Sequence, residues 1–589
     1  MSKIRKKRTI IILVVMLLIS MITVVTGDAK PFIDGEAETI EVNRSYTSHL
    51  ENWDDELYYC FSLPSSGIVS YSFSHDYVDD IRDFWELQLL DKDKNELIYQ
   101  TYQGKTVDEQ RSPHIGLPAG TYYILIKPFL GHFDPAVFTF RINFEPSDVW
   151  ETELNDYKHT ATSVKLNTEY SGAFRSWEDK DYYCFTLSSA GSVSIDFSHD
   201  FTDETGEVWF LRLENENEER LFDGGYKGTD ISVKTSNQIG LPEGTYYICV
   251  YSKSSLGTPT EDYRFSVNYA EDISWEQEFN DKMASVNPIE LNRDYSGSLL
   301  SGNDKDYFGF TIPASGCISI RFSHDFCDTS DELWKIRILD KEENEYFSSS
   351  YRGDTLNARE SDHIGLPAGN YYFEVLRGTQ YSPVNYTFNI LYSESDIWEK
   401  ELNDNVHSAN PITLDADWFG SLSANTDIDC FQFEMPAEGY LDVEFQHEYV
   451  DNPVNLWKLQ IMTDENEEYD SFGFVGDTEG TEKPSTAEMP AGTYFVRVSK
   501  GDGYSSEDYR FSLKYHEISS IDLNNLLNGT AAQGITEWIC PECGYKNDTL
   551  FCIKCGTPKP EKIICPGCGK EYDPDSGVVF CGTCGTKLQ

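Results

Sequence analysis

Eight cysteines near the C-terminus of the 589-residue chain have the spacing of metal ligands. They form four Cys-x2-Cys pairs within residues 537–589. Four thiolates make a closed tetrahedral zinc site, so this segment is expected to bind two zinc ions. Pairing in sequence order gives one site of Cys540, Cys543, Cys552 and Cys555 and a second of Cys565, Cys568, Cys581 and Cys584. An interleaved pairing and a disulfide framework are the alternatives.

A second set of candidate ligands is acidic and occurs three times. Each begins with a hexapeptide of the form E-x-E-[LF]-N-D, and an Asp-x-Asp pair follows 23 residues after its last Asp. The candidate ligands are Glu151, Glu153, Asn155, Asp156, Asp179 and Asp181, then Glu276, Glu278, Asn280, Asp281, Asp304 and Asp306, then Glu399, Glu401, Asn403, Asp404, Asp427 and Asp429. Calcium prefers six to eight oxygen ligands, so these sets predict up to three calcium ions. A solvated acidic linker with an Asn-Asp turn is the alternative.

Other chemistry is not indicated by the motifs. His75, His199, His324 and His447 each end an apolar strand pattern, where a hydrogen-bonded structural role is expected rather than a metal or acid-base role. The sequence contains no G-x-S-x-G elbow, H-E-x-x-H helix or phosphate-binding loop. No catalytic residues are therefore predicted, and we expect the chain not to be an enzyme.

The elements that carry these residues repeat as whole domains. Leu117-Pro118-Ala119-Gly120-Thr121-Tyr122-Tyr123 recurs at offsets of 124, 125 and 123 residues, and so does Phe73-Ser74-His75-Asp76. Residues 193–199 alternate apolar and polar side chains, as expected of a half-buried strand. The prediction is an all-β chain of four antiparallel jelly-roll-like β-sandwiches. They cover residues 31–147, 148–271, 272–395 and 396–518, and a linker of residues 519–536 leads to the zinc-binding tail.

The first repeat departs from this pattern in its acidic residues. At the position of the Asp-x-Asp pair it has Asp55-Glu56-Leu57, and no acidic hexapeptide precedes it. We therefore expect the first sandwich to lack a calcium site.

These repeats resemble a known bacterial module. The D-x-D-[YF]-[YF]-x-F strand, as in residues 179–185, and the L-P-x-G-[TN]-Y-[YF] hairpin are similar to the pre-peptidase C-terminal domain. This domain is commonly appended to secreted peptidases and is related to the collagen-binding domains of clostridial collagenases. The resemblance covers residues 31–518 and implies calcium at the E-x-E-x-N-D linkers, in an accessory module without its enzyme. The tail resembles a double zinc ribbon.

The N-terminus and the net charge indicate the compartment and limit the partners. Five basic residues between Lys3 and Arg8 precede an apolar run from Ile10 to Val25, which predicts a signal peptide or a signal-anchor transmembrane helix in residues 1–30. A buried helix of a soluble domain is the alternative. The net charge of -53 disfavours nucleic acid as a partner.

Together these features predict a non-enzymatic, extracytoplasmic binding or adhesion protein of the bacterial cell surface, either secreted or membrane-anchored. Its expected partner is an extracellular protein or polysaccharide polymer, with the membrane as a second partner if the N-terminal helix is not cleaved. A structural spacer that presents the zinc ribbons and an accessory subunit of a secreted peptidase are the alternatives.

Overall fold

The computed structural model describes residues 37–518, apart from residues 177, 254–260, 356 and 479, and parts of the tail (538–540, 542–547, 554, 558, 562–572 and 582–587). The predicted signal or anchor segment and the linker of residues 519–536 lie outside the described residues. Among the residues that are described, no helix has the length and apolar character needed to cross a membrane. The chain divides into two compact units: one contains the first three sandwiches, and the other contains the fourth sandwich with residues 362–366.

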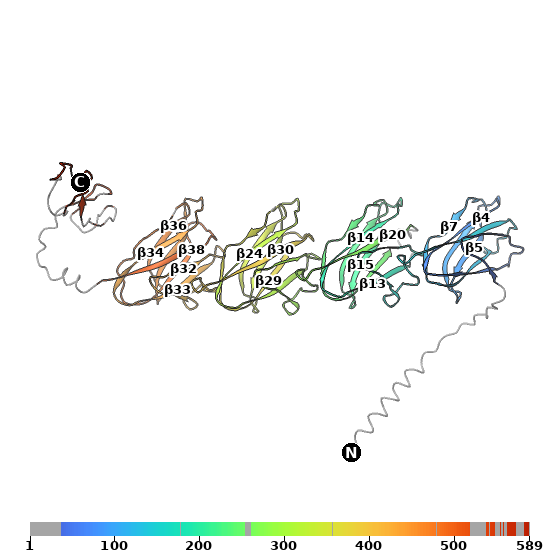
Figure 1. Cartoon of the computed structure of the whole chain (residues 1–589), viewed down its shortest axis with the longest axis horizontal. Coiled ribbons are helices and arrows are strands. Elements are labelled where there is room, and N and C mark those ends of the chain that lie inside the picture. The colour runs from blue at the N-terminus through green and yellow to red at the C-terminus, as the bar shows by residue number, and fades with distance from the viewer. Residues whose placement is uncertain are drawn as a thin grey trace, which may run out of the picture. The chain divides into compact units, whose positions relative to one another are not determined.

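The first sandwich consists of two mainly antiparallel sheets (Figure 1). Its first sheet has the strand order β1 (Glu38–Thr39), β3 (Leu57–Leu63), β9 (Gly120–Pro128), β5 (Asp83–Leu90) and β6 (Glu96–Gln103). Its second sheet has the order β2 (Ser45–Ser48), β10 (Phe138–Pro146), β4 (Gly67–His75) and β7 (Gln110–Arg111), and β8 (Ile115–Leu117) also pairs with β4.

The second and third sandwiches repeat this topology. In the second, the sheets are β11 (Thr162–Ser163), β13 (Lys180–Leu187), β19 (Gly244–Ser252), β15 (Glu207–Asn215) and β16 (Arg220–Lys227), and β12 (Glu169–Gly172), β20 (Tyr263–Glu271), β14 (Gly191–His199) and β17 (Lys234–Thr235), with β18 (Ile239–Leu241) on β14. In the third they are β21 (Asn287–Pro288), β23 (Lys305–Ile312), β29 (Gly369–Arg377), β25 (Glu332–Leu339) and β26 (Glu345–Arg352), and β22 (Asp294–Gly297), β30 (Tyr386–Glu394), β24 (Gly316–His324) and β27 (Arg359–Glu360). Short 3-10 helices, η1 (Lys158–Thr160) and η3 (Met283–Ser285), follow the first two acidic hexapeptides.

The second unit contains the short strand β28 (Ile364–Leu366) and the fourth sandwich. The sheets of this sandwich are β31 (Asn410–Pro411), β33 (Ile428–Met435), β37 (Gly492–Lys500), β35 (Asn455–Thr463) and β36 (Glu468–Val475), and β32 (Asp417–Gly420), β38 (Tyr509–Glu517) and β34 (Gly439–His447). The all-β sandwich fold predicted from the repeats is therefore confirmed.

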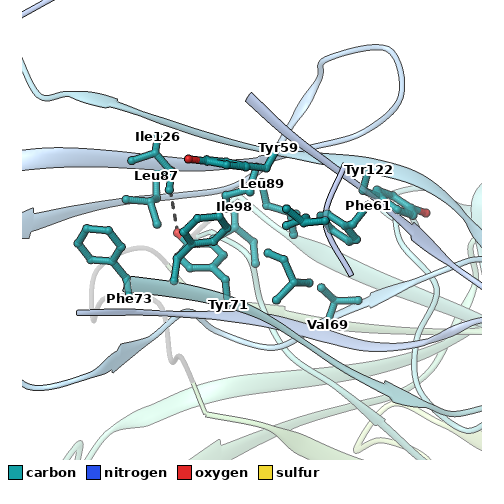
Figure 2. Close-up of a cluster of buried hydrophobic side chains, with 14 of the residues drawn as sticks. Tyr59, Phe61, Val69, Tyr71, Phe73, Leu87, Leu89, Ile98, Tyr122 and Ile126 are labelled. Carbon is teal, nitrogen blue, oxygen red and sulfur yellow. Dashed lines mark hydrogen bonds between the residues drawn. The ribbon is translucent and has the colours of Figure 1, made fainter. Parts of the chain in front are cut away.

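Alternating apolar residues form the core between the two sheets of each sandwich. Figure 2 shows this core in the first sandwich, where Val69 and Phe73 of β4 face Leu87 and Leu89 of β5. In the second sandwich the predicted alternation is observed, because Val193, Ile195 and Phe197 are fully buried. Burying one such side chain contributes about 1.5–3 kcal/mol, and the repeated pattern therefore gives every copy its own core.

Two short hairpins make up most of the described tail. They pair β39 (Trp538–Ile539) with β40 (Lys546–Asn547), and β41 (Ile563–Ile564) with β42 (Glu571–Tyr572). Each hairpin encloses one Cys-x2-Cys-Gly sequence.

Candidate metal centres

A glycine in a short strand holds each acidic hexapeptide in place. The amide of the second glutamate donates to the carbonyl oxygen of this glycine: Glu153 to Gly116 at 2.9 Å, Glu278 to Gly240 at 3.1 Å and Glu401 to Gly365 at 3.0 Å. Only glycine fits here, because a Cβ on Gly240 would lie 1.9 Å from the carbonyl oxygen of Glu276. This contact therefore holds the hexapeptide backbone in place independently of its side chains.

The predicted ligands gather into three clusters, which we number in chain order. The first cluster contains Glu151, Glu153, Asn155, Asp156, Asp179 and Asp181, the second Glu276, Glu278, Asn280, Asp281, Asp304 and Asp306, and the third Glu399, Glu401, Asn403, Asp404, Asp427 and Asp429. In each one, carboxylate oxygens of both glutamates and of the second Asp of the Asp-x-Asp pair lie within 4.8 Å of one another. We call these three residues the inner triad: Glu151, Glu153 and Asp181; Glu276, Glu278 and Asp306; Glu399, Glu401 and Asp429.

Hydrogen bonds orient the inner triad from the following sandwich. In the second cluster, the amide of Ser298 donates to Glu276 at 2.6 Å. The hydroxyl of Tyr386 lies within hydrogen-bonding distance of Glu276 (3.0 Å) and of Asp306 (2.5 Å), and its single proton is donated to one of them at a time. Tyr263 and Tyr509 donate to the equivalent Asp181 and Asp429. The Asp of each inner triad therefore has one oxygen bound by a tyrosine hydroxyl, whereas its other oxygen accepts no hydrogen bond.

In each cluster, some of the oxygens have no hydrogen-bond partner among the described residues. The side-chain carbonyl oxygens of Asn155, Asn280 and Asn403 are buried without a hydrogen bond, and so is one carboxylate oxygen of Asp181, Asp306 and Asp429. All six side chains are 0% exposed. A buried oxygen without a donor is costly, and its recurrence in three clusters fits a cation as the missing partner.

Electrostatics support the same interpretation. Burial raises the pKa of Glu276 to about 8 and that of Asp304 to about 7. Burial, and then repulsion from neighbouring carboxylates, raises the pKa of Glu278 and Asp306 well above the usual range. A divalent cation counteracts both effects by stabilising the ionised form.

The first cluster differs from the others because a basic side chain enters it. The guanidinium of Arg175 lies 2.6 Å from Glu153, 3.0 Å from Asp156 and 2.9 Å from Asp179. No ion pair of this kind occurs at the carboxylates of the second and third clusters within the described parts of the chain.

The first sandwich lacks most of these groups. Leu57 and Phe138 occupy the positions of the ligand Asp181 and the orienting Tyr263, and Asp55 accepts hydrogen bonds from backbone amides of its own loop. At these two positions the first copy therefore has neither a carboxylate nor a hydroxyl, and its lack of a calcium site stays a prediction.

The tail brings some of the predicted zinc ligands together. The sulfur atoms of Cys565, Cys568 and Cys584 lie within 4.8 Å of one another, and the first and last are 3.5 Å apart. Gly544, Gly569 and Gly585, each following a Cys-x2-Cys pair, have φ of 68°, 72° and 72°, which glycine adopts readily. Cys540 and Cys543 lie on the first hairpin loop, whereas Cys552, Cys555 and Cys581 lie outside the described residues.

The four recurrent histidines are packed as structural residues. Each ring stacks on the recurrent tryptophan of its own sandwich at 3.9–4.2 Å between centroids. Each Nδ1 lies within hydrogen-bonding distance of the next residue's carbonyl oxygen. This agrees with the structural role expected of them.

An exposed aromatic side chain follows each of these histidines by two positions. Tyr77, Phe201, Phe326 and Tyr449 are each more than half exposed. Acidic residues occupy the position before and the second position after every one of them. The same small aromatic and acidic surface is thus present on all four sandwiches.

Two functional features were not predicted from the sequence. The orienting tyrosines Tyr263, Tyr386 and Tyr509 begin the last strand of their sandwiches, where the first copy has Phe138. An alignment of the four copies shows this difference and could have identified them. Arg175 occurs in one copy alone, and no repeated pattern indicates it.

Comparisons with known proteins give partial matches. No protein-family model matches the chain. A 239-residue stretch is 27% identical to collagenase ColT of Clostridium tetani and covers 40% of this chain and 23% of that protein, so the chain spans less than a quarter of this relative. Among solved structures, it is similar to the pre-peptidase C-terminal domain of a collagenase from Bacillus anthracis (23% identity, 18% of this chain, 94% of that one, TM-score 0.15). It is also similar to the CUB1-EGF-CUB2 region of human MASP-1/3 (9% identity, 38% of this chain, 98% of that one, TM-score 0.12).

Proposed function

We propose that the chain is a non-enzymatic, extracytoplasmic, multidomain binding protein with calcium sites at its three acidic linkers. The observation that carries the calcium sites is the buried side-chain carbonyl oxygen of Asn155, Asn280 and Asn403, which has no hydrogen-bond partner and lies beside clustered carboxylates. The donor set consists of oxygen alone, which suits a hard cation. Calcium is favoured over magnesium, which usually retains several water molecules.

The proposed role of calcium is to fix each linker against the sandwich that follows it. In the second cluster, Glu276, Glu278 and Asn280 come from the linker, and Asp306 comes from β23. The amide of Glu278 is also bound to Gly240 of the preceding sandwich. A ligand bound at 100 times its dissociation constant stabilises the bound form by about 2.7 kcal/mol, enough to change how firmly a junction is held.

The proposed partner is an extracellular fibrous protein such as collagen. This proposal comes from the similarity to a collagenase, and the recurrent exposed aromatic side chains give it a candidate surface. Acidic residues beside Tyr77, Phe201, Phe326 and Tyr449 favour segments that carry lysine or arginine. Four weak contacts on one chain raise the overall affinity through effective concentration.

For the tail we propose two structural zinc ions bound by the eight cysteines in sequence order. The grouping of Cys565, Cys568 and Cys584 supports sequential pairing, since all three belong to the second predicted site. A four-thiolate site has no open coordination position, so the zinc is expected to hold the fold of this segment rather than to act in catalysis. For the N-terminal segment we propose export, with the chain either released or anchored.

Calcium binding can be tested on the full chain. After removal of loosely bound ions on a chelating resin, terbium, a calcium mimic, is titrated and its luminescence excited through tyrosine, because Tyr263, Tyr386 and Tyr509 touch the proposed ligands. We expect saturable luminescence that calcium displaces. Asp306→Asn should remove part of the signal, whereas Asp55→Asn in the first sandwich should leave it unchanged. A full chain without saturable, calcium-displaceable luminescence would contradict the calcium sites.

Polymer binding needs a separate experiment. Full chain is sedimented with collagen fibrils, and a variant with serine at Tyr77, Phe201, Phe326 and Tyr449 is compared with a control in which the exposed Leu130 and Val233 become serine. We expect only the first variant to lose binding. Retention by wall polysaccharide but not by collagen would favour the polysaccharide polymer. No retention, together with calcium-dependent change in solution scattering, would favour a spacer, and proteolytic activity would contradict the non-enzymatic assignment.

A further inference from the structure

The second sandwich has a cleft along one side, between the edge strands of its two sheets. β16 lies at the edge of one sheet and β17 at the edge of the other. The cleft has a volume of about 410 Å³ and is lined by residues of both strands and of the segments that follow them, together with Glu207 at the start of β15. Pockets of this size bind small molecules. The residues that line it do not include any member of the three carboxylate clusters.

Two glycines of β16 shape this cleft, and only the second sandwich has both. In place of Gly224 and Gly225, the other copies have Gln100 and Thr101, Ser349 and Ser350, and Phe472 and Gly473. A Cβ on Gly224 would lie 2.8 Å from the ring of Phe222, and one on Gly225 would lie 2.5 Å from the carboxylate of Glu207. The glycines therefore allow this ring and this carboxylate to lie directly against the strand.

In the first sandwich, the side chains at the two glycine positions serve as hydrogen-bond partners. The hydroxyl of Tyr102 donates to Gln100 at 2.8 Å. The hydroxyl of Thr101 donates to Asp83 at 2.9 Å. Both polar groups at this edge of the first sandwich are thus satisfied within the sandwich itself.

The counterparts of Tyr102 and Asp83 in the second sandwich are Tyr226 and Glu207, and glycine replaces the partner of each. Within the described residues, neither side chain makes a hydrogen bond or an ion pair. Tyr226 is 8% exposed, and its hydroxyl lies 3.2 Å from the point that a Cβ on Gly224 would occupy. Burial raises the pKa of Tyr226 to about 12, so the hydroxyl keeps its proton and can donate. A buried hydroxyl without a partner is costly, and a ligand in the cleft would remove this cost.

The cleft is electrically balanced although the chain is strongly acidic. Its charged side chains are two acidic and two basic ones: Glu207, Asp230, Lys227 and Lys234. Asp230 and Lys234 form an ion pair at 2.9 Å, whereas the side chains of Glu207 and Lys227 make none with any described residue. A carboxylate, an ammonium group and a hydroxyl are thus available beside the ring of Phe222. This lining favours a neutral ligand that can both donate and accept hydrogen bonds.

We propose that the cleft between β16 and β17 binds a neutral sugar residue of a glycan. Sugar hydroxyls both donate and accept hydrogen bonds, so they can pair with Glu207 as well as with Tyr226 and Lys227. The apolar C–H face of the sugar ring packs on the ring of Phe222, and the edge strands offer unpaired backbone groups. The inference goes beyond the proposed function, because it needs neither the calcium sites nor the recurrent exposed aromatic side chains.

The test is the binding of disaccharides to the full chain, measured by saturation-transfer difference NMR. The neutral probes are cellobiose, maltose, lactose and diacetylchitobiose, and a hyaluronan disaccharide is the charged comparison. We expect saturable binding of at least one neutral probe. Gly224→Gln, which copies Gln100, gives Tyr226 a partner and should abolish this binding. Tyr226→Phe should weaken it by about 2- to 12-fold, the factor expected of one hydrogen bond. Tyr102→Phe in the first sandwich is the matched control and should change nothing.

Each outcome supports or overturns the inference. No saturable binding of any neutral probe by the wild type would overturn it, and so would tighter binding of the charged disaccharide. Equal binding by the wild type, Gly224→Gln and Tyr226→Phe would show that the sugar does not occupy this cleft. The fold of each variant is checked by circular dichroism. If Gly224→Gln fails to fold, Tyr226→Phe decides the question, since the fourth sandwich has Phe474 at this position. None of these outcomes changes the case for calcium or for collagen.

Discussion

Replacing Gly240 with alanine should open the second junction and weaken calcium binding at the site proposed there. The glycine carbonyl accepts the amide of Glu278 at 3.1 Å, and the backbone of Glu276 crosses directly over its Cα. A Cβ at this position would lie 1.9 Å from the carbonyl oxygen of Glu276 and 2.8 Å from its carbonyl carbon. Since non-bonded carbon and oxygen atoms rest more than about 3 Å apart, the linker must move away by about 1 Å or more.

The cost can be worked out from these contacts. The lost hydrogen bond contributes about 0.5–1.5 kcal/mol, and forcing an extra methyl group into a packed contact costs about 1–3 kcal/mol. Together they predict about 1.5–4.5 kcal/mol against the docked linker. If all of it acts on the calcium-bound form, calcium affinity at this cluster falls by about 10- to 1,600-fold, at about 1.4 kcal/mol per factor of ten.

Two measurements on the full chain check this. Calcium titration should show one class of sites weakened by that factor, and limited proteolysis in saturating calcium should reveal cleavage near residues 272–282. Gly302→Ala is the matched control, because its nearest neighbours lie 3.7 Å from the added Cβ, which is ordinary contact. Unchanged affinity and unchanged protection in Gly240→Ala would show that the linker is not held by this contact.

Three further predictions follow from other contacts. Tyr386→Phe removes the hydroxyl that orients Glu276 and Asp306, and a calcium titration should show binding at one cluster weakened by about 10- to 100-fold. The fold should persist, because Phe138 occupies the same place in the first sandwich. An unchanged titration would argue against orientation by the hydroxyl. His114 bonds Asp262 of the next sandwich at 2.9 Å, and this bond and the nearby Asp200 raise its pKa above 6.5 despite burial and Arg111, which lower it. The stabilisation that this ion pair gives to the junction should therefore be complete below pH 6.5 and lost as the pH rises through the raised pKa of His114. Proteolysis of the junction should accordingly become faster at higher pH. His114→Gln, which copies Gln238, should remove this pH dependence. Native mass spectrometry of the full chain should detect two zinc ions. Cys568→Ser should lower this number and expose the tail to protease. Two zinc ions retained in this variant would contradict the role of Cys568 as a ligand.

Repetition made much of this molecule predictable from its sequence. The markers at intervals of 123–125 residues gave the number of sandwiches, and alternation placed Val193, Ile195 and Phe197 on the buried face, as observed. The very short strands, such as β8 and β11, could not be predicted, because two or three residues are too few to show a period. Both nevertheless contact the linker: Gly116 of β8 accepts a hydrogen bond from the amide of Glu153, and Thr162 of β11 accepts one from the amide of Thr152.

The candidate centres were predictable in composition but not in geometry. Each cluster is assembled from residues that lie near one another in the sequence, and their acidic pattern indicated a cation before any contact was known. Tyr386 lies 110 residues after Glu276, and only the pairing of β30 with β24 and β22 brings its hydroxyl to the carboxylate. Arg175 is harder still to predict, because a comparison of the copies detects the residues that they share and overlooks a residue that occurs in only one of them.

The glycine beneath each linker also gives the sandwiches an order. Gly116, Gly240 and Gly365 leave room for the backbone of a hexapeptide, whereas the fourth sandwich has the exposed Glu488 at the equivalent position. Conversely, the last three sandwiches have the Asp carboxylates and the tyrosine that contact the linker before them, whereas the first has Leu57 and Phe138 at two of these positions. The copies are therefore not interchangeable modules: the two middle ones can be duplicated in tandem, the first can only precede another, and the fourth can only follow one.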